Sequence, residues 1–474
     1  MVKRTISIAL SFVGLIVGAG FASGQEIQQY FVSYGTWGIL GAILAAVIMA
    51  ATGYTVLQLG SYYMADEHNE VLSGSLPTWV SKFLDLAIIA TLFCIGFVMF
   101  AGAGENLKQQ LGWPVWAGSA IMLVLVLAAG MLDVDKVSAV IGGITPFIIV
   151  FVVAASIYSF ADRSDSWGHL SEVASSIPNS FPNFALSSLN YVGLSLILSV
   201  SMAIVIGGSH LYPREAGWGG FFGGFTFGIL LTISAVALLC STATVKDDAL
   251  PMLSLVNNIN DGLGWVMAVI IYGMIFNTAI GMFYSLSRRL SAKRPDKFRI
   301  IFIGVTLAGF VLSFLGFKSL IATVYPALGY LGVFLIIVLL IAWFRGHSRI
   351  EDEAERRDRI SELVERRDNP KKRFTSKQRR QLRHLVRASN IENAELREAV
   401  RKELDEESDD DSHDASSDEN TSGDEGATAQ GESSASAAGT NGDTSEGRST
   451  ETSGSQSTDN SGGRSGSVAA STSD

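Results

Sequence analysis

Long apolar runs separated by short polar loops fill the first 344 residues of the chain. Apolar runs of about 20 residues are long enough to cross the hydrocarbon core of a bilayer as helices. We find ten such runs, at approximately residues 5–33, 37–63, 83–104, 114–132, 137–160, 186–208, 218–241, 263–287, 299–317 and 319–344. The pattern predicts an all-α integral membrane domain with ten transmembrane helices over residues 1–344.

The pattern changes abruptly after Phe344. Residues 345–405 hold 18 Lys and Arg against 13 Asp and Glu, with thin apolar stripes at helical spacing, which indicates short charged helices in the cytoplasm. Residues 406–474 hold 16 acidic and 2 basic residues among Ser and Gly, so they lack the apolar residues needed for a core. We therefore expect three parts: a membrane domain, a charged helical segment and a disordered acidic tail.

The loop charges predict the orientation of the spans. If the N-terminus is inside, eleven Lys and Arg of the short loops lie on the cytoplasmic side and four lie outside. Because cytoplasmic loops carry an excess of Lys and Arg, both termini are predicted to be cytoplasmic in a multi-pass protein of the plasma membrane.

Irregular features recur at matched places in the two sets of five spans. Span one has its glycine cluster at Gly18, and span six has Ser199 and Ser201 at a similar depth; span five contains Pro146 and span ten Pro326. The separations are 128 positions from Gly18 to Pro146 and 127 from Ser199 to Pro326. Since five is odd, the second set must run through the membrane in the opposite sense. The pattern predicts a 5+5 inverted repeat in which helices one and six are broken near the midplane, as in secondary transporters.

The glycine cluster has two interpretations. Gly weakens a helix by about 1 kcal/mol relative to Ala, so a break from Gly18 to Gly20 would present backbone groups to a substrate. Irregular backbone at membrane depth survives only where it lines protein or a wet cavity. The alternative is close helix packing through the small-xxx-small spacings Gly14/Gly18 and Gly20/Gly24.

The same residues carry a family resemblance. The motif "GLIVGAGFASGQE" from Gly14 to Glu26, with ten spans and both ends inside, resembles the YkvI-like membrane proteins. This largely uncharacterised group is classed with the permeases of the amino acid, polyamine and organocation superfamily. The resemblance covers residues 1 to about 344 and implies the 5+5 fold of the leucine-transporter type, without naming a substrate.

Glu26 is the carboxylate that lies deepest in an apolar run. An intramembrane acid costs about 2.5–3.5 kcal/mol on insertion scales and is a functional hypothesis by default. If span one breaks at Gly18, Glu26 falls about two turns above the break, where it could pair with a substrate ammonium, form a gate or carry a proton. If span one is unbroken, about 20 residues from Thr5 already reach Gly24, and Glu26 lies at the outer interface.

Substrate contacts are expected at the break. The amides of Ala19, Gly20 and Phe21 could receive a carboxylate at the positive end of the outer half-helix, and the Phe21 ring could cover an apolar side chain. Ser199 and Ser201 would face them from helix six. Because the spans contain no Lys or Arg apart from Arg299 at the start of the ninth, an amino acid or a small neutral solute fits better than a polyanion.

The resemblance also implies a sodium site between helices one and eight. The matching positions are Gly14 and Val17 on helix one, with Met274, Asn277 and Thr278 on helix eight. Asn277 departs from the usual Ser/Thr pair, although its amide oxygen is a suitable ligand. The alternative is that Asn277 and Thr278 hydrogen-bond to neighbouring helices.

The sequence offers no motif for an enzyme, a nucleotide or another cofactor. The patterns G-x-x-x-x-G-K-[ST] and H-E-x-x-H and the nucleophile elbow are absent from the 474 residues. We therefore expect a non-enzymatic permease coupled to sodium or protons, with no nucleic-acid partner. Two rivals stay open: a membrane receptor that signals through residues 345–405, and a permease for a nucleobase or an amine.

A basic cluster in the charged segment has two interpretations as well. Its residues are Lys371, Lys372, Arg373, Lys377, Arg379, Arg380 and Arg383. It is either a solvated helix surface or a contact with anionic lipids of the inner leaflet, where each basic residue can add about 1 kcal/mol.

Overall fold

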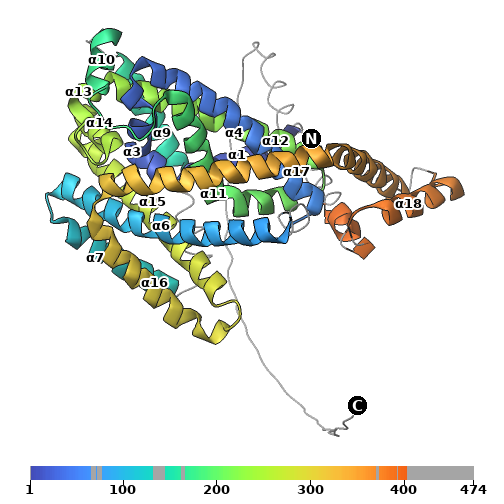
Figure 1. Cartoon of the computed structure of the whole chain (residues 1–474). Helices are drawn as coiled ribbons and strands as arrows, with labels where there is room; N and C mark the ends of the chain where they lie inside the picture. The colour runs from blue at the N-terminus through green and yellow to red at the C-terminus, as the bar shows by residue number, and fades with distance from the viewer. Residues whose placement is uncertain are drawn as a thin grey trace, which may run out of the picture. The chain divides into compact units, whose positions relative to one another are not determined.

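The computed structural model describes residues 2–65, 71, 77–131, 145–161, 166–369, 373–391, 393–394 and 396–402, and most of these are helical (Figure 1). The membrane part begins with α1 (Val2–Ile16), α2 (Ala19–Ser23), α3 (Gln25–Tyr30), α4 (Thr36–Tyr63), α6 (Thr78–Leu111), α7 (Val115–Gly130), α9 (Thr145–Ala161) and α10 (Trp167–Ala174). It continues with α11 (Phe184–Gly208), α12 (Pro213–Cys240), α13 (Thr242–Val245), α14 (Pro251–Ile259), α15 (Asp261–Leu290), α16 (Phe298–Leu312), α17 (Phe317–Asp368) and α18 (Ser376–Ala388).

The long helices pack in two groups. In one group α1 contacts α11 and α12, and α4 contacts the same two helices. In the other group α6 contacts α7, α15 and α16, and α7 also contacts α15 and α16. Helix α17 lies between the groups and contacts α4, α6 and α11 (Figure 1).

Glycines allow the closest of these contacts. A Cβ added to Gly220 of α12 would lie 2.2 Å from the carbonyl oxygen of Gly53 of α4, and one added to Gly224 would lie 2.6 Å from that of Met49. On α17, a Cβ at Gly332 would lie 1.8 Å from the carbonyl oxygen of Gly193 of α11. Small residues that let backbones approach are typical of helix interfaces in membranes.

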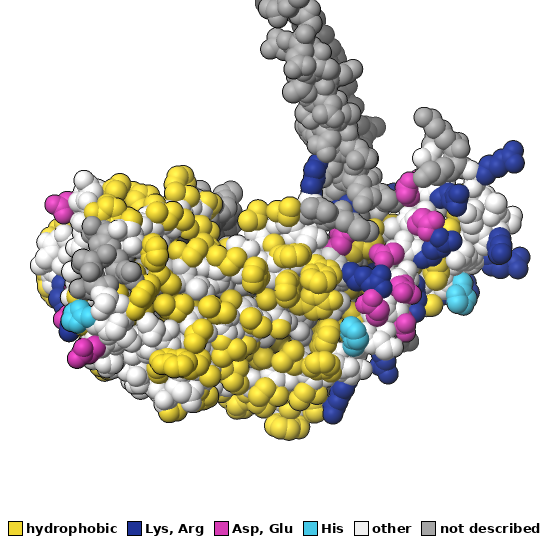
Figure 2. Space-filling view, turned by 90° about the horizontal axis from the view of Figure 1, so that it is seen from above, with side chains coloured by type: hydrophobic (Ala, Val, Ile, Leu, Met, Phe, Trp, Pro, Cys, Tyr) yellow, Lys and Arg dark blue, Asp and Glu magenta, His cyan; other side chains and the backbone are white. Residues whose placement is uncertain are grey.

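The described chain contains seven helices long and apolar enough to cross a membrane: α4, α6, α11, α12, α15, α17 and the stretch Pro295–Leu315 around α16. The other three predicted spans correspond to the divided segment α1–α3, to the 16-residue α7 and to α9, whose predicted start at residue 137 falls outside the described residues. Figure 2 shows hydrophobic side chains over much of one face, with charged side chains gathered toward its two ends. The protein is thus a multi-pass membrane protein.

The predicted break in helix six is wrong. Helix α11 runs without interruption through Ser199 and Ser201. The Ser199 hydroxyl donates to the carbonyl oxygen of Ser195 at 2.8 Å, so its polar group is satisfied within the helix. A serine in a membrane helix can bond back to the preceding turn in this way, whereas glycine offers no such bond.

The charged segment continues α17 and packs on the membrane part, so no helix end marks the change in composition after Phe344. A small hydrophobic cluster joins it to the loop between α11 and α12. Its members are Leu211, Ile360, Leu363, Leu382, Val386, Ile391, Leu396 and Val400. The acidic tail from residue 406 lies outside the described residues.

A fully buried arginine fixes this packing. The Arg357 guanidinium donates to the carbonyl oxygens of Ser61 at 2.8 Å and Tyr62 at 2.8 Å, near the end of α4, and to that of Leu211 at 3.0 Å. It also pairs with the buried carboxylate of Glu353 at 3.2 Å. Because the last carbonyls of a helix lack partners within it, Arg357 caps α4 from a segment almost 300 positions away.

Candidate functional site

The first span is broken twice. Helix α1 ends at Ile16, and α2 begins at Ala19 after the extended residue Gly18. Helix α2 then stops at Gly24, whose φ of +76° lies in the left-handed region that favours glycine. A Cβ at Gly24 would also lie 3.0 Å from the backbone nitrogen of Met252. The break predicted from Gly18 to Gly20 is therefore present at Gly18, whereas Gly20 lies inside α2, and a second break follows at Gly24.

The second break turns Glu26 back toward α2. A Cβ added to Gly20 would lie 1.5 Å from Oε1 of Glu26 and 2.1 Å from its Cδ. The carboxylate thus occupies the space that any other residue at position 20 would fill. Since α1 ends at Ile16, the premise of an unbroken span with Glu26 at the interface fails, and the side chain is only 9% exposed.

The surroundings of Glu26 are aromatic and hydroxylic. Tyr30 of α3, Tyr191 of α11 and Tyr325 of α17 are all buried and close enough to interact electrostatically with its carboxylate. Within the described part of the chain Glu26 has neither an ion pair nor a hydrogen bond. An ionised carboxylate with no partner at this depth is costly, so the geometry favours a neutral Glu26 or one that binds a cation.

The side of the molecule that the loop charges predict to be outside is closed over this site. All six residues of α3 are buried. The Gln28 amide donates to the carbonyl oxygen of Lys246 at 3.0 Å, beside α13, and the Gln29 amide donates to the Ser180 hydroxyl at 2.9 Å. The polar face of α3 is therefore covered by the α10–α11 and α12–α14 connections.

A hydrogen-bonded chain links the same region to α11 and α17. The Tyr30 hydroxyl donates to Oδ1 of Asn190 at 3.1 Å, and Nδ2 of Asn190 donates to the carbonyl oxygen of Pro326 at 3.0 Å. Pro326 lies inside α17 and has no N–H, which frees the carbonyl of Ala322. The Ser180 hydroxyl donates to that carbonyl at 3.1 Å. Two carbonyls of α17, those of Ala322 and Pro326, thus accept from the side chains that bond to α3.

The other predicted substrate residues are placed as follows. Ala19, Gly20 and Phe21 form the first turn of α2, so their amides have no partner within that helix. The Phe21 ring packs on Phe227 of α12 with centroids 5.6 Å apart. Ser199 bonds within α11, as described above.

Ser201 belongs to a different contact. Its hydroxyl accepts a 3.5 Å bond from Arg289 of α15, whose guanidinium pairs with Asp85 of α6 at 2.6 Å. This contact joins α11, which belongs to the first helix group, to α6 and α15, which belong to the second.

The positions predicted for sodium lie on α1 and α15. Gly14 faces open space, with no atom within 4 Å of an added Cβ, and Val17 is buried. Met274 is buried, while Asn277 and Thr278 are partly exposed on α15. The sodium site stays a prediction.

Sequence reasoning missed the residues that surround Glu26. Asn190 is fully buried inside an apolar run, and an amide in such a run is a signal that could have found it. The three tyrosines gave no such signal, because Tyr is common at membrane interfaces and in packed cores.

Two curated relatives share most of their length with this chain. The "Uncharacterized membrane protein YkvI" of Bacillus subtilis (strain 168) is 25% identical over 342 residues, which are 70% of this chain and 94% of that protein. The chain is a relative of YkvI. The "Uncharacterized protein YyaD" of the same organism is 25% identical over 333 residues, which are 70% of this chain and 95% of that protein. No protein-family model matches the chain.

These relatives confirm the resemblance seen in the first span. They are matched over nearly their whole length, while 30% of this chain lies outside the match.

A solved structure shows the same fold. The crystal structure of MhsT in complex with L-phenylalanine matches with a TM-score of 0.52, at 14% identity, over 83% of this chain and 98% of that one. The leucine-transporter type of fold expected from the sequence is thereby confirmed at the level of overall architecture.

Proposed function

We propose that the chain is a non-enzymatic secondary transporter for an amino acid or a similar small solute, and that Glu26 couples transport to protons. One observation carries the proposal: the Glu26 carboxylate lies without a counter-charge against Gly20, in the broken first span. Broken helices at membrane depth form the substrate and ion sites of secondary transporters. The likeness to MhsT, whose structure holds L-phenylalanine, supports the same class of protein.

The position of Glu26 suggests how proton and substrate binding are linked. The amides of Ala19, Gly20 and Phe21, which have no partner within α2, suit a substrate carboxylate, and the Glu26 carboxylate lies against Gly20. An ionised Glu26 would repel a second carboxylate there, whereas a protonated one would accept it. Binding of the proton and of the substrate would therefore favour each other, which is the requirement for symport.

We also propose the ten-span inverted repeat. If spans one to five correspond to spans six to ten, the helix contacts should match in pairs. The contact of α1 with α12 then corresponds to that of α11 with α4, and the contact of α6 with α16 corresponds to that of α15 with α7. All four contacts are present, which supports the repeat. The proposal keeps both termini in the cytoplasm, as the loop charges predict.

The basic residues of α18 are proposed to face anionic lipids. Arg379, Arg380 and Arg383 are exposed, while Leu382 and Val386 pack toward α17. A helix with one buried apolar stripe and one basic face can lie at the inner leaflet. Lys371 and Lys372 lie outside the described residues.

A receptor is the second candidate function. It is favoured by Arg357, which ties the additional C-terminal part to the end of α4 and to the α11–α12 loop. Such a tie could pass a ligand-induced movement of the membrane helices to the cytoplasm.

Reconstitution separates the two functions. Purified full-length chain in vesicles is given radiolabelled amino acids, with L-phenylalanine as the first probe, under proton, sodium or no gradient. Accumulation under a gradient supports the transporter. Saturable binding with no flux under any gradient would favour the receptor instead.

A further inference from the structure

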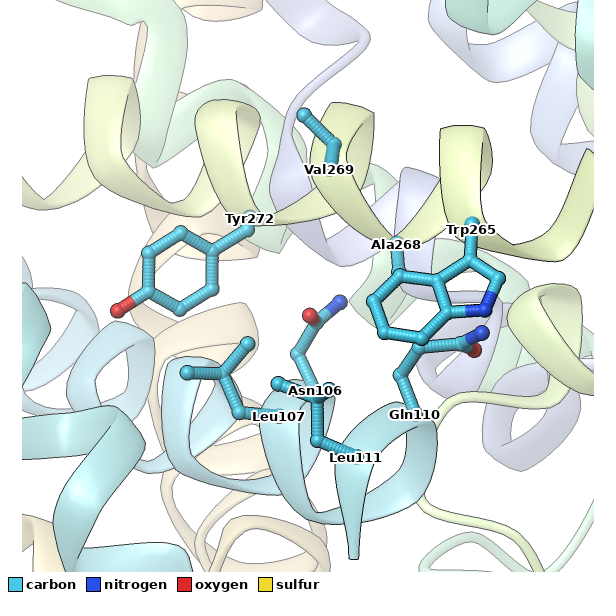
Figure 3. A pocket seen from close by; sticks show the side chains of 8 residues that line it. All are labelled: Asn106, Leu107, Gln110, Leu111, Trp265, Ala268, Val269 and Tyr272. Carbon is cyan, nitrogen blue, oxygen red and sulfur yellow. The ribbon is translucent and has the colours of Figure 1, made fainter. Parts of the chain in front are cut away.

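Helices α6 and α15 line a cavity of about 150 Å³. It lies where α6 ends at Leu111 and where α15 begins at Asp261 (Figure 3). Leu107, Ala268 and Val269 make much of its wall. This end of the molecule is the one predicted to be outside.

The base of the cavity holds an unsatisfied amide. Asn106 is fully buried, and neither its Oδ1 nor its Nδ2 has a hydrogen-bond partner in the described part of the chain. Figure 3 shows the amide directed into the space between the rings of Tyr272 and Trp265. A buried polar group left unpaired costs about 1–3 kcal/mol, so an occupant that pairs with it is favoured.

The neighbouring polar side chains already have partners. The Tyr272 hydroxyl donates to the carbonyl oxygen of Gly118 at 2.9 Å, and Oε1 of Gln110 accepts from Asn257 at 3.0 Å. A buried water needs two to four polar partners. With the rest of the wall largely apolar, Asn106 suits a molecule that is mostly apolar and carries one hydrogen-bonding oxygen.

The rim of the cavity is exposed at the surface of the protein. Val269 is 69% exposed and Trp265 is 49% exposed. Trp113 and Trp116, which follow the end of α6, are also exposed. Exposed tryptophans gather where the hydrocarbon meets the headgroups, which is also the depth of the glycerol backbone of a lipid.

We propose that this cavity binds the glycerol region of a membrane lipid. A glycerol-linked oxygen accepts a hydrogen bond from Nδ2 of Asn106, and the first carbons of the chain pack against Trp265 and Val269. A cavity of this volume holds a molecule of about six heavy atoms, such as benzene, so the rest of the lipid stays in the bilayer. The lipid joins α6 to α15 from the outside.

Native mass spectrometry of the full-length chain tests the site. The probes are dioleoyl phosphatidylglycerol and its ether-linked analogue, added to delipidated protein. The variant Asn106→Leu keeps the size of the side chain and removes its amide group. The matched control is Asn258→Leu, on the exposed side of α14. We expect wild type and the control to retain one lipid per chain, and Asn106→Leu to retain it at least about tenfold more weakly. Equal retention by Asn106→Leu would overturn the proposal.

A second variant makes the test independent of how Asn106→Leu folds. Val269→Trp fills the rim from an exposed position and leaves Asn106 unchanged. We expect it to lose the same bound lipid, and to lose the rise in Tm that added lipid gives to wild type. Undiminished lipid retention by Val269→Trp would reject the cavity as the binding site.

Discussion

The carboxylate of Glu26 fills the space where a side chain of Gly20 would stand, 1.5 Å from an ideal Cβ. Gly20 and Glu26, which are six positions apart, are brought together because the chain turns at Gly24. The backbone of Gly24 adopts the left-handed conformation at that turn. The relationship explains why the first span carries glycines and a carboxylate in one motif: the glycine makes room for the acid.

The first prediction concerns Gly20→Ala. The added methyl group must displace the Glu26 carboxylate, which is the flexible end of its side chain, so the protein should still fold with a loss of about 1–3 kcal/mol. Gradient-driven uptake should fall at least about tenfold, which corresponds to about 1.4 kcal/mol. Gly304→Ala on α16 is the matched control, because no atom lies within 4 Å of its Cβ. Equal uptake by both variants would mean that the Glu26 position does not matter.

The second prediction concerns the closed side of the molecule, which the loop charges predict to be outside. Asn190→Ala removes the acceptor of a buried hydrogen bond from Tyr30 and the donor of a part-buried hydrogen bond to Pro326, and should cost about 1–3 kcal/mol. Because these bonds hold α3 to α11 and α11 to α17, the site should open more often. The rate at which a thiol reagent labels Gln28→Cys in the variant measures the opening. Tyr30→Phe breaks one of the two bonds and should give a smaller increase; no increase in either variant would show that the closure depends on other contacts.

The third prediction concerns the C-terminal segment. Arg357→Met leaves the carboxylate of Glu353, which is 1% exposed, without this partner. Breaking a buried pair costs about 3–5 kcal/mol, so residues 345–402 should detach from the membrane part. Limited proteolysis should cut there faster. Arg359→Gln removes an exposed pair with Glu362 on the same helix and should change little; equal cleavage of the two variants would remove Arg357 from this role.

Much of the fold was predictable because each long helix contains one apolar run. Span six was expected at 186–208 and is found at Phe184–Gly208. Helix α6 is longer than its predicted span, 83–104, because its polar ends pack on other elements, as Gln109 does by bonding to Ser254 of α14 at 2.7 Å. The extension of a helix beyond its apolar part depends on such contacts, which periodicity does not show.

The site was predictable only in part. The break at Gly18 follows from local conformational preference, and so does the intact backbone of α11 once Ser199 is seen to bond to its own helix. The Gly20–Glu26 contact depends on the turn at Gly24. From the sequence alone, the spacing of Gly20 and Gly24 is interpreted only as a small-xxx-small pair for close helix packing. Arg357 and Asn106 were missed because their importance arises from burial. In the sequence, Arg357 is one arginine of a charged run and Asn106 lies just beyond the predicted end of span three.

Counterflow and proton-driven uptake measured on the same vesicles test the role of Glu26 most directly. Wild type and Glu26→Gln are reconstituted in parallel, and uptake of labelled amino acid is measured with an inward proton gradient and with substrate loaded inside at equal pH. The account predicts that wild type accumulates substrate under the gradient, whereas Glu26→Gln exchanges substrate but does not accumulate it. Accumulation by Glu26→Gln to the wild-type level, or by wild type under a sodium gradient alone, would contradict proton coupling at Glu26.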